Sequence, residues 1–175
     1  MKKFKILACA LAITSFGLTS CSNDDDNAVN EEAQIAGTYN LTEVRTAEPT
    51  DFNDDGTFNA NQMRESDCYN DSKLILNADN TFTYHKNRII VNTADGTSGC
   101  TEGTFTGTWT ILDGSGSDAV IAATYEDNNG DETTLNLVKT GVEIIQTDLF
   151  GTYPDRNDEG GAITTFGEVE YVYRK

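Results

Sequence analysis

The chain has 175 residues, of which 29 are acidic and 12 are basic, and its formal net charge is −17 at pH 7. This negative charge repels phosphate backbones and anionic headgroups, which argues against nucleic acid as a partner and leaves divalent cations and cationic surfaces. The length provides for one domain with a single hydrophobic core.

Residues 1–20 have the pattern of a secretory signal peptide. Three lysines within the first five residues precede an apolar stretch that is too short to cross a membrane as a helix. Residues 18–21, Leu-Thr-Ser-Cys, resemble a bacterial lipobox, in which the cysteine receives a lipid such as palmitate and begins the mature chain. We therefore predict attachment to a membrane through Cys21; the alternative is an ordinary secretory signal followed by an unrelated cysteine.

Residues 21–36 are polar and acidic and show no apolar periodicity, so they are predicted to form a disordered tether. An acidic run directly after a lipidated cysteine resembles the export signal of outer-membrane lipoproteins of the Bacteroidetes type. The alternative is a solvated spacer without a targeting role. The predicted location is the outer membrane, and both its cell-surface and its periplasmic face stay open.

The two remaining cysteines are predicted to form a disulfide. Cys9 belongs to the signal peptide and Cys21 to the anchor, which leaves Cys68 and Cys100 in an oxidising, exported context. In the chain-entropy model, closing this loop stabilises the fold by about 3.7 kcal/mol. The alternative, a pair of metal ligands, has little support because the chain has one histidine and no CxxC spacing.

From residue 37 onward, apolar residues recur with a period of two, which is typical of half-buried β-strands. In the segment 104–112, Phe105, Trp109 and Ile111 share one face and four threonines share the other. Further strands are expected at 37–44, 74–84 as a hairpin, 88–92, 120–138 as a hairpin around Asn129-Gly130, 142–150 and 168–175.

These segments predict an all-β domain over residues 37–175: an antiparallel up-and-down β-barrel of about eight to nine strands. At most one short helix is expected, around residues 60–66. Closure into a barrel follows because open strand edges invite aggregation, and mostly sequential hairpins favour a barrel over a Greek-key sandwich.

The segments GTYNLTEV, LILNADNTFTY and GTWTIL, together with the lipobox and acidic tether, resemble the lipocalin-like lipoproteins of Bacteroidetes. The resemblance spans the whole mature domain. Gly37-Thr38-Tyr39 stands where lipocalins usually carry Gly-x-Trp, so a tyrosine replaces the tryptophan that plugs the barrel floor. The resemblance implies a barrel cavity that holds a small apolar molecule.

Two functions follow as hypotheses. In the first, the barrel interior binds a small apolar or amphipathic ligand, and in the second the interior is solid and surface loops contact a glycan or another envelope protein. An empty apolar cavity favours the first, and a packed interior with an aromatic surface patch favours the second. The candidate interior ligand-binding residues are Tyr39, Phe82, Tyr84, Phe105, Trp109 and Tyr171.

The stretch DFNDDGTFNANQ, residues 51–62, has the oxygen spacing of a calcium loop. Asp51, Asn53, Asp55 and the carbonyl of Thr57 fall on alternate positions, with a glycine at the sixth position for the sharp turn. The twelfth position carries a glutamine, which offers one neutral oxygen, so Glu65 is the candidate closing ligand. The alternative is a solvated turn rich in Asp and Asn. The candidate metal ligands are therefore Asp51, Asn53, Asp55, Thr57 and Glu65, and Ca²⁺ would have a structural role.

The sequence indicates a binding protein and not an enzyme. His85 follows Tyr84 and is expected on the outer face, and no nucleophile–base arrangement, HExxH or phosphate-binding glycine loop is present in the sequence. A hydrolase with a carboxylate pair stays open, because 29 acidic residues make some pairs inevitable. The oligomeric state is not predicted.

Overall fold

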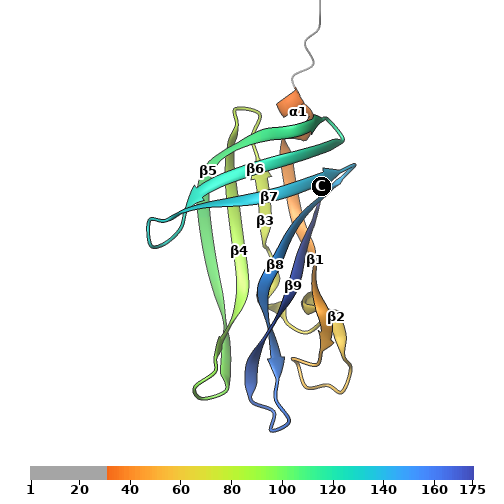
Figure 1. Ribbon diagram of the computed structural model, residues 1–175, viewed down its shortest axis with the longest axis vertical. Coiled ribbons are helices and arrows are strands. Elements are labelled where there is room, and N and C mark those ends of the chain that lie inside the picture. Colours follow the sequence, from red (N-terminus) through yellow and green to blue (C-terminus); the bar gives the residue numbers. More distant parts are fainter. Residues whose placement is uncertain (1–30) are drawn as a thin grey trace, which may run out of the picture.

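The computed structural model describes residues 31–175, which form one closed antiparallel sheet (Figure 1). The strand order is β2-β1-β3-β4-β5-β6-β7-β8-β9, and a further pairing of β1 with β9 closes eight strands into a barrel with β2 as an extra edge strand. The prediction of an all-β up-and-down barrel is thereby confirmed. The predicted signal peptide, Cys21 and the tether as far as residue 30 lie outside the described residues.

The strands are β1 (Gly37–Thr50), β2 (Asn59–Asn61), β3 (Lys73–Leu76), β4 (Thr81–Asn92), β5 (Thr97–Ser115), β6 (Asp118–Glu126), β7 (Glu132–Thr140), β8 (Glu143–Arg156) and β9 (Ala162–Arg174). The helical segments are α1 (Glu31–Ile35) and two 3₁₀ turns, η1 (Gln62–Arg64) and η2 (Asp67–Tyr69). The short helix predicted for 60–66 is the 3₁₀ turn η1, whereas η2 and α1 lie outside that range. Within residues 31–175, no helix is long and apolar enough to span a membrane.

Three hairpins turn in the same way, at residues 77–81, 127–131 and 157–161. In each, the first residue is Asn or Asp, and its amide donates to the carbonyl of the fifth residue at 2.9–3.0 Å. The fourth residue has a positive φ, which Gly and Asn adopt at the lowest cost: Asn80 (65°), Gly130 (83°) and Gly160 (81°). Local turn chemistry therefore sets the register of β3–β4, β6–β7 and β8–β9.

Two-residue alternation fills the barrel with apolar side chains. Leu74 and Leu76 of β3 pair with Tyr84 and Phe82 of β4, and all four are buried. Trp109 of β5 is also buried, and its indole N–H donates to the carbonyl of Asn77 at 3.0 Å. The alternation that predicted the strands is therefore also the alternation that builds the core.

The end of the barrel beside α1 is plugged. Ile35 and Tyr39 are both completely buried, and the Tyr39 hydroxyl donates to the Ile35 carbonyl at 2.5 Å. The ammonium of Lys175 donates to the Ala36 carbonyl at 2.7 Å, so both ends of the described domain meet here. The predicted tether over 21–36 is corrected accordingly: residues 31–36 belong to the domain because Ile35 is part of its core.

The opposite end is open because neighbouring strands separate there. β7 and β8 pair over only four residue pairs, from Leu137↔Gln146 to Thr140↔Glu143, whereas β4 and β5 pair along the whole length of β4. The hairpins β1–β2, β4–β5 and β8–β9 extend beyond the closed part and point away from α1 (Figure 1). The space between these hairpins is where the barrel can admit a ligand.

The predicted disulfide is confirmed. Cys68 in η2 is bonded to Cys100 in β5, with a Cα–Cα distance of 5.1 Å. Cys100 pairs with Ile89 of β4 in the sheet, so the disulfide holds η2 against the β4–β5 hairpin near the open end.

Candidate ligand-binding cleft

Four of the six predicted interior ligand-binding residues belong to the packed core. Tyr39, Phe82, Tyr84 and Trp109 are each no more than 2% exposed. They contact other core side chains, and the Tyr84 and Phe82 rings pack edge-on against Tyr125. The closed part of the barrel is therefore filled by its own side chains.

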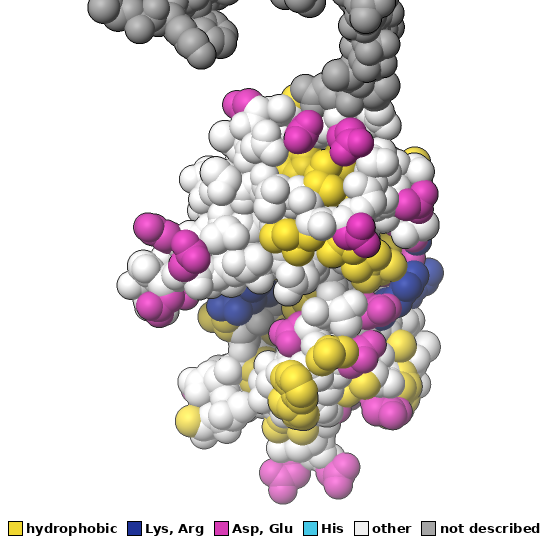
Figure 2. Space-filling view, turned by 45° about the horizontal axis from the view of Figure 1, so that its top comes forward, with side chains coloured by type: hydrophobic (Ala, Val, Ile, Leu, Met, Phe, Trp, Pro, Cys, Tyr) yellow, Lys and Arg dark blue, Asp and Glu magenta, His cyan; other side chains and the backbone are white. Residues whose placement is uncertain are grey.

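The other two, Phe105 and Tyr171, line cavities in the open part. Phe105 lies in a cavity of about 340 Å³ between β4, β5 and the β6–β7 turn. Tyr171 lies in a second cavity of about 180 Å³ between β4, η2, β8 and β9. Lys86 and Arg88 line both cavities. We call this pair of cavities the β4 cleft; Figure 2 shows basic side chains in a recess beneath the upper part of the barrel, with acidic ones spread over the outer surface.

The sequence of β4 explains the position of the two bases. Phe82, Tyr84, Lys86 and Arg88 follow one another at every second residue, so all four lie on the inner face. Where the apolar residues end, the same face carries charge. The residue opposite Lys86 is Gly103, which has no side chain, and the Phe105 ring lies over that glycine.

No ion pair neutralises these bases within residues 31–175. The ion pairs found there involve Arg45 and Arg174, which bind Glu43, Glu143 and Glu170 on the outer surface. The Lys86 ammonium lies 5.9 Å from the centroid of the Tyr84 ring. Burial lowers the pKa of Lys86 from its ordinary value, and the positive charge of Arg88 lowers it further, while the negative charge of Asp148 acts in the opposite direction.

Three tyrosines line the cavities that Arg88 also lines. Tyr125 lines the larger cavity, and Tyr69 and Tyr171 line the smaller one. Burial raises the pKa of all three phenols, while the nearby Arg88 charge acts in the opposite direction on each. The hydroxyls therefore stay protonated at neutral pH and are available as hydrogen-bond donors.

The acids of the cleft are partly engaged by the backbone. The carboxylate of Asp127 accepts from the amides of Asn129 (2.8 Å) and Asp131 (3.0 Å), and these bonds lower its pKa. Asp148 accepts from the amide of Phe150 at 3.1 Å. Glu102 belongs to the rim of the larger cavity, since it lies on the face of β5 opposite Gly103 and Phe105.

The predicted calcium loop folds onto its own backbone amides. The two carboxylate oxygens of Asp51 accept from the amides of Asp55 (3.0 Å) and Gly56 (2.9 Å). Asn53 accepts from the amide of Asp55 at 3.1 Å, and Asp55 from the amide of Thr57 at 2.8 Å. These contacts are those of a turn rich in Asp and Asn, which was the alternative interpretation of this stretch.

Glu65 nevertheless reaches the loop, as the sequence predicted. It is 5% exposed, and its carboxylate accepts from the amide of Asn53 at 3.3 Å. Burial raises its pKa, and the charges of Asp55 and Asp51 raise it further. The oxygen of the completely buried Gln62 side chain has no hydrogen-bond partner within residues 31–175.

No group of three or more His, Cys, Asp or Glu residues in the described part of the chain is arranged to hold a metal ion. Because the loop oxygens already accept from amides, a calcium ion would have to replace some of those bonds. Calcium binding by Asp51, Asn53, Asp55, Thr57 and Glu65 stays a prediction.

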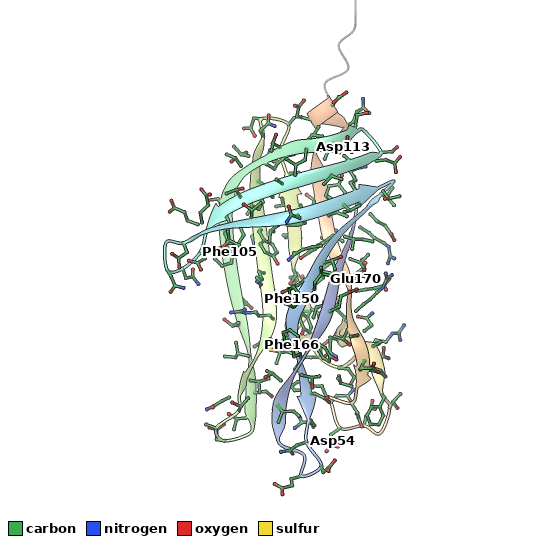
Figure 3. The ribbon with its side chains drawn as sticks, in the orientation of Figure 1. Asp54, Phe105, Asp113, Phe150, Phe166 and Glu170 are labelled. Atoms are coloured by element: carbon green, nitrogen blue, oxygen red, sulfur yellow. A yellow bond between two sulfur atoms is a disulfide. The ribbon has the colours of Figure 1, made fainter. Side chains whose placement is uncertain are left out.

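An aromatic pair lies on the outer surface of the β8–β9 hairpin. Phe150 is 78% exposed and Phe166 is 66% exposed, with ring centroids 6.3 Å apart (Figure 3). His85 is on the outer face of β4, as expected, with Nδ1 at 3.1 Å from the Thr104 hydroxyl. Neither feature shares a cavity with the β4 cleft.

Sequence reasoning identified Phe105 and Tyr171 but missed Lys86 and Arg88. The signal for them was present: the inner-face alternation of Phe82 and Tyr84 continues through Lys86 and Arg88 in an otherwise acidic chain. Only the pairing with β5, which places small residues opposite them, shows that these bases face a cavity.

A family model described as a domain of unknown function, DUF5004, matches residues 17–152. The chain belongs to the DUF5004 family. The matched part includes Lys86, Arg88, Phe105 and Tyr125, whereas Tyr171 on β9 lies beyond it. No curated protein matches the chain. No solved structure matches it either. The DUF5004 description does not mention lipocalins, so that resemblance stays a prediction.

Proposed function

We propose that this DUF5004 chain is a lipid-anchored envelope protein that binds a small amphipathic molecule in its β4 cleft. The observation that carries the proposal is the pair of cavities, about 340 and 180 Å³, that adjoin Lys86 and Arg88 while the closed part of the barrel is filled. The larger volume is at the lower end of the range of about 300–1,000 Å³ for small-molecule pockets, so the ligand is small.

The cleft offers an apolar wall as well as charge. The rings of Phe105 and Tyr125 have centroids 4.9 Å apart and line the larger cavity together. Such a wall supports binding of an apolar or aromatic body by area burial. The proposal assigns no catalytic step.

A fluorescent probe tests binding at this place. The neutral dye N-phenyl-1-naphthylamine should bind the full-length chain with enhanced emission. The substitution Thr101→Trp, on the inner face opposite Arg88, should fill the cavity and abolish the signal. Thr106→Trp, at an exposed position of the same strand, should leave it unchanged. Equal binding by both variants, or no binding by the wild-type chain, contradicts the proposal.

The anchoring part of the proposal rests on the lipobox-like residues 18–21 and has its own test. Bacteria that express the full-length chain are grown with an alkyne-bearing palmitate analogue, and the chain is isolated and analysed for label. Label should be present on the wild-type chain and on Cys9→Ser, and absent from Cys21→Ser. Label on Cys21→Ser would show that this cysteine is not the attachment site.

The exposed pair Phe150 and Phe166 supports the second candidate function, a surface that contacts a glycan or another envelope protein. Exposed aromatic side chains are enriched where proteins bind partners. A Phe150→Ser, Phe166→Ser variant should lose retention on immobilised glycans from the cell envelope and keep dye binding. Unchanged retention would contradict this second function, and loss of dye binding would show that the dye binds at the aromatic pair and not in the cleft.

A further inference from the structure

The positive charge in the β4 cleft has no counter-charge bound to it. Lys86 and Arg88 lie two residues apart on one face, and neither side chain forms an ion pair or a hydrogen bond within residues 31–175. In a chain with 29 acidic and 12 basic residues, two adjacent unpaired bases facing a cavity are a specific arrangement.

The nearby acids do not fill this role. Asp127 is held by two amides of its own turn, and Asp148 is not within 4.0 Å of the Lys86 ammonium, since no ion pair joins them. Both acids instead set a limit on the ligand, because a second negative group near them would be repelled.

The hydroxyls of Tyr125 and Tyr171 complete the set of donors. Neither makes a hydrogen bond within the described residues, and each belongs to a cavity that Arg88 also lines. A planar guanidinium, an ammonium and phenolic hydroxyls together suit a compact anion with several acceptor oxygens.

We infer that the ligand of the β4 cleft is an amphipathic anion whose charged group is bound between Lys86 and Arg88 and whose apolar body lies against Phe105 and Tyr125. The inference rests on the proposed function and adds the chemical class of the ligand to it. One small anionic group, such as a carboxylate or sulfonate, satisfies the two bases while the surrounding acids disfavour a more highly charged head.

Two dyes that differ by one charged group distinguish the proposed binding cleft from the inferred anionic class of its ligand. N-Phenyl-1-naphthylamine and 8-anilino-1-naphthalenesulfonate share their aromatic body, and only the second carries a sulfonate. The full-length chain should bind the sulfonate about ten-fold or more tightly than the neutral dye, as expected for charge-assisted hydrogen bonds. This preference should shrink as salt is raised, because the anion is screened from the bases.

Substitutions then test whether Lys86 and Arg88 cause the preference for the sulfonate dye. Lys86→Met, Arg88→Met should reduce the preference to about two-fold or less while binding of the neutral dye is kept. Arg64→Met, Lys73→Met changes the net charge equally outside the cleft and should retain the full preference. Melting curves of both variants, and the two single Lys86 and Arg88 variants, establish that the comparison is made between folded chains.

The outcomes distinguish the two proposals. If the wild-type chain binds neither dye, the proposed function itself fails. If it binds both dyes equally, or if the control variant loses the preference as strongly as the cleft variant, the neutral-ligand cleft stands and the anionic class is wrong. Competition identifies the charged group: decanoate should displace the sulfonate dye about ten-fold or more effectively than decanol, and inorganic phosphate, which has no apolar body, should not displace it.

Discussion

Within seven residues, β4 passes from the core of the barrel to its solvent-facing cleft without any change of face. Phe82 and Tyr84 are 1% exposed, Lys86 is half-buried, and Arg88 is exposed. The residue types could be predicted to lie on one face from alternation alone. Alternation does not predict that Lys86 and Arg88 face a cavity, because this depends on Gly103 and Thr101 opposite them in β5.

The buried carboxylate of Glu65 makes the stability of the fold depend on pH. Its pKa is raised by burial, so the folded state binds a proton there more tightly than the unfolded chain, whose value is about 4.3. Stability from this group is therefore fully present below pH 4.3 and is lost as pH rises through the folded pKa. Glu65→Gln should raise the free energy of unfolding at pH 7 and have little effect near pH 4.

Denaturant titrations of both chains at pH 4 and pH 7, with chelator present, measure this difference. The exposed Glu48→Gln is the matched control and should show no pH-dependent gain. If Glu65→Gln is equally or less stable than the wild-type chain at pH 7, burial of this carboxylate is not a cost to the fold.

Strand register in the hairpins depends on short turns that have a local sequence signature. The turns at 77–80 and 129–130 could therefore be predicted from the sequence. The long connection from β1 to β3 was harder, because it holds a loop, a short strand and two 3₁₀ turns. Its Asp and Asn side chains suit both a calcium loop and an amide-capped turn, and spacing alone does not separate the two.

Two glycines test the difference between a turn and a close strand contact. A Cβ at Gly107 in β5 would collide with the Thr124 carbonyl and lie 2.9 Å from the Phe82 ring. A Cβ at Gly130 meets nothing within 4 Å, although its φ is +83°. Gly107→Ala should therefore destabilise by about 2 kcal/mol or more, and Gly130→Ala by about 1 kcal/mol. Urea unfolding measures both, and equal losses would contradict this packing.

Calcium binding by the 51–65 loop is tested with matched charge changes. Calcium should raise the melting temperature of the full-length chain relative to chelator, and Asp51→Asn should remove that increase. Asp54→Asn removes one charge from the same loop, where no side-chain hydrogen bond of Asp54 is seen in the described chain, and should keep it. Identical wild-type melting curves in calcium and chelator would leave the loop as an amide-capped turn.

For the molecule as a whole, barrel closure followed from alternation across residues 37–175 and from the need to pair open strand edges, and the disulfide followed by elimination among four cysteines. The filled interior did not follow, because the apolar face of a strand looks the same whether it packs against other side chains or lines a cavity. The short β7–β8 pairing, which opens the barrel, is a long-range feature without a local sequence signature.

The disulfide is expected to stabilise the whole domain. Cys68 and Cys100 are 32 residues apart, so removing their bond should lower the free energy of unfolding by about 3.7 kcal/mol through loop entropy. Cys68→Ala, Cys100→Ala should show this loss in guanidinium unfolding, and reduction of the wild-type chain should reproduce it. A drop below about 1 kcal/mol would show that the surrounding sheet already holds η2 in place.

The plug formed by Ile35 and Tyr39 also fixes a direction. The chain enters the barrel at the filled pole, where Lys175 also binds the Ala36 carbonyl, and the three long hairpins point toward the other pole (Figure 1). A chain attached to a membrane through its N-terminal residues would therefore have its β4 cleft facing away from that membrane. The cleft would then be accessible to small molecules in the surrounding solution.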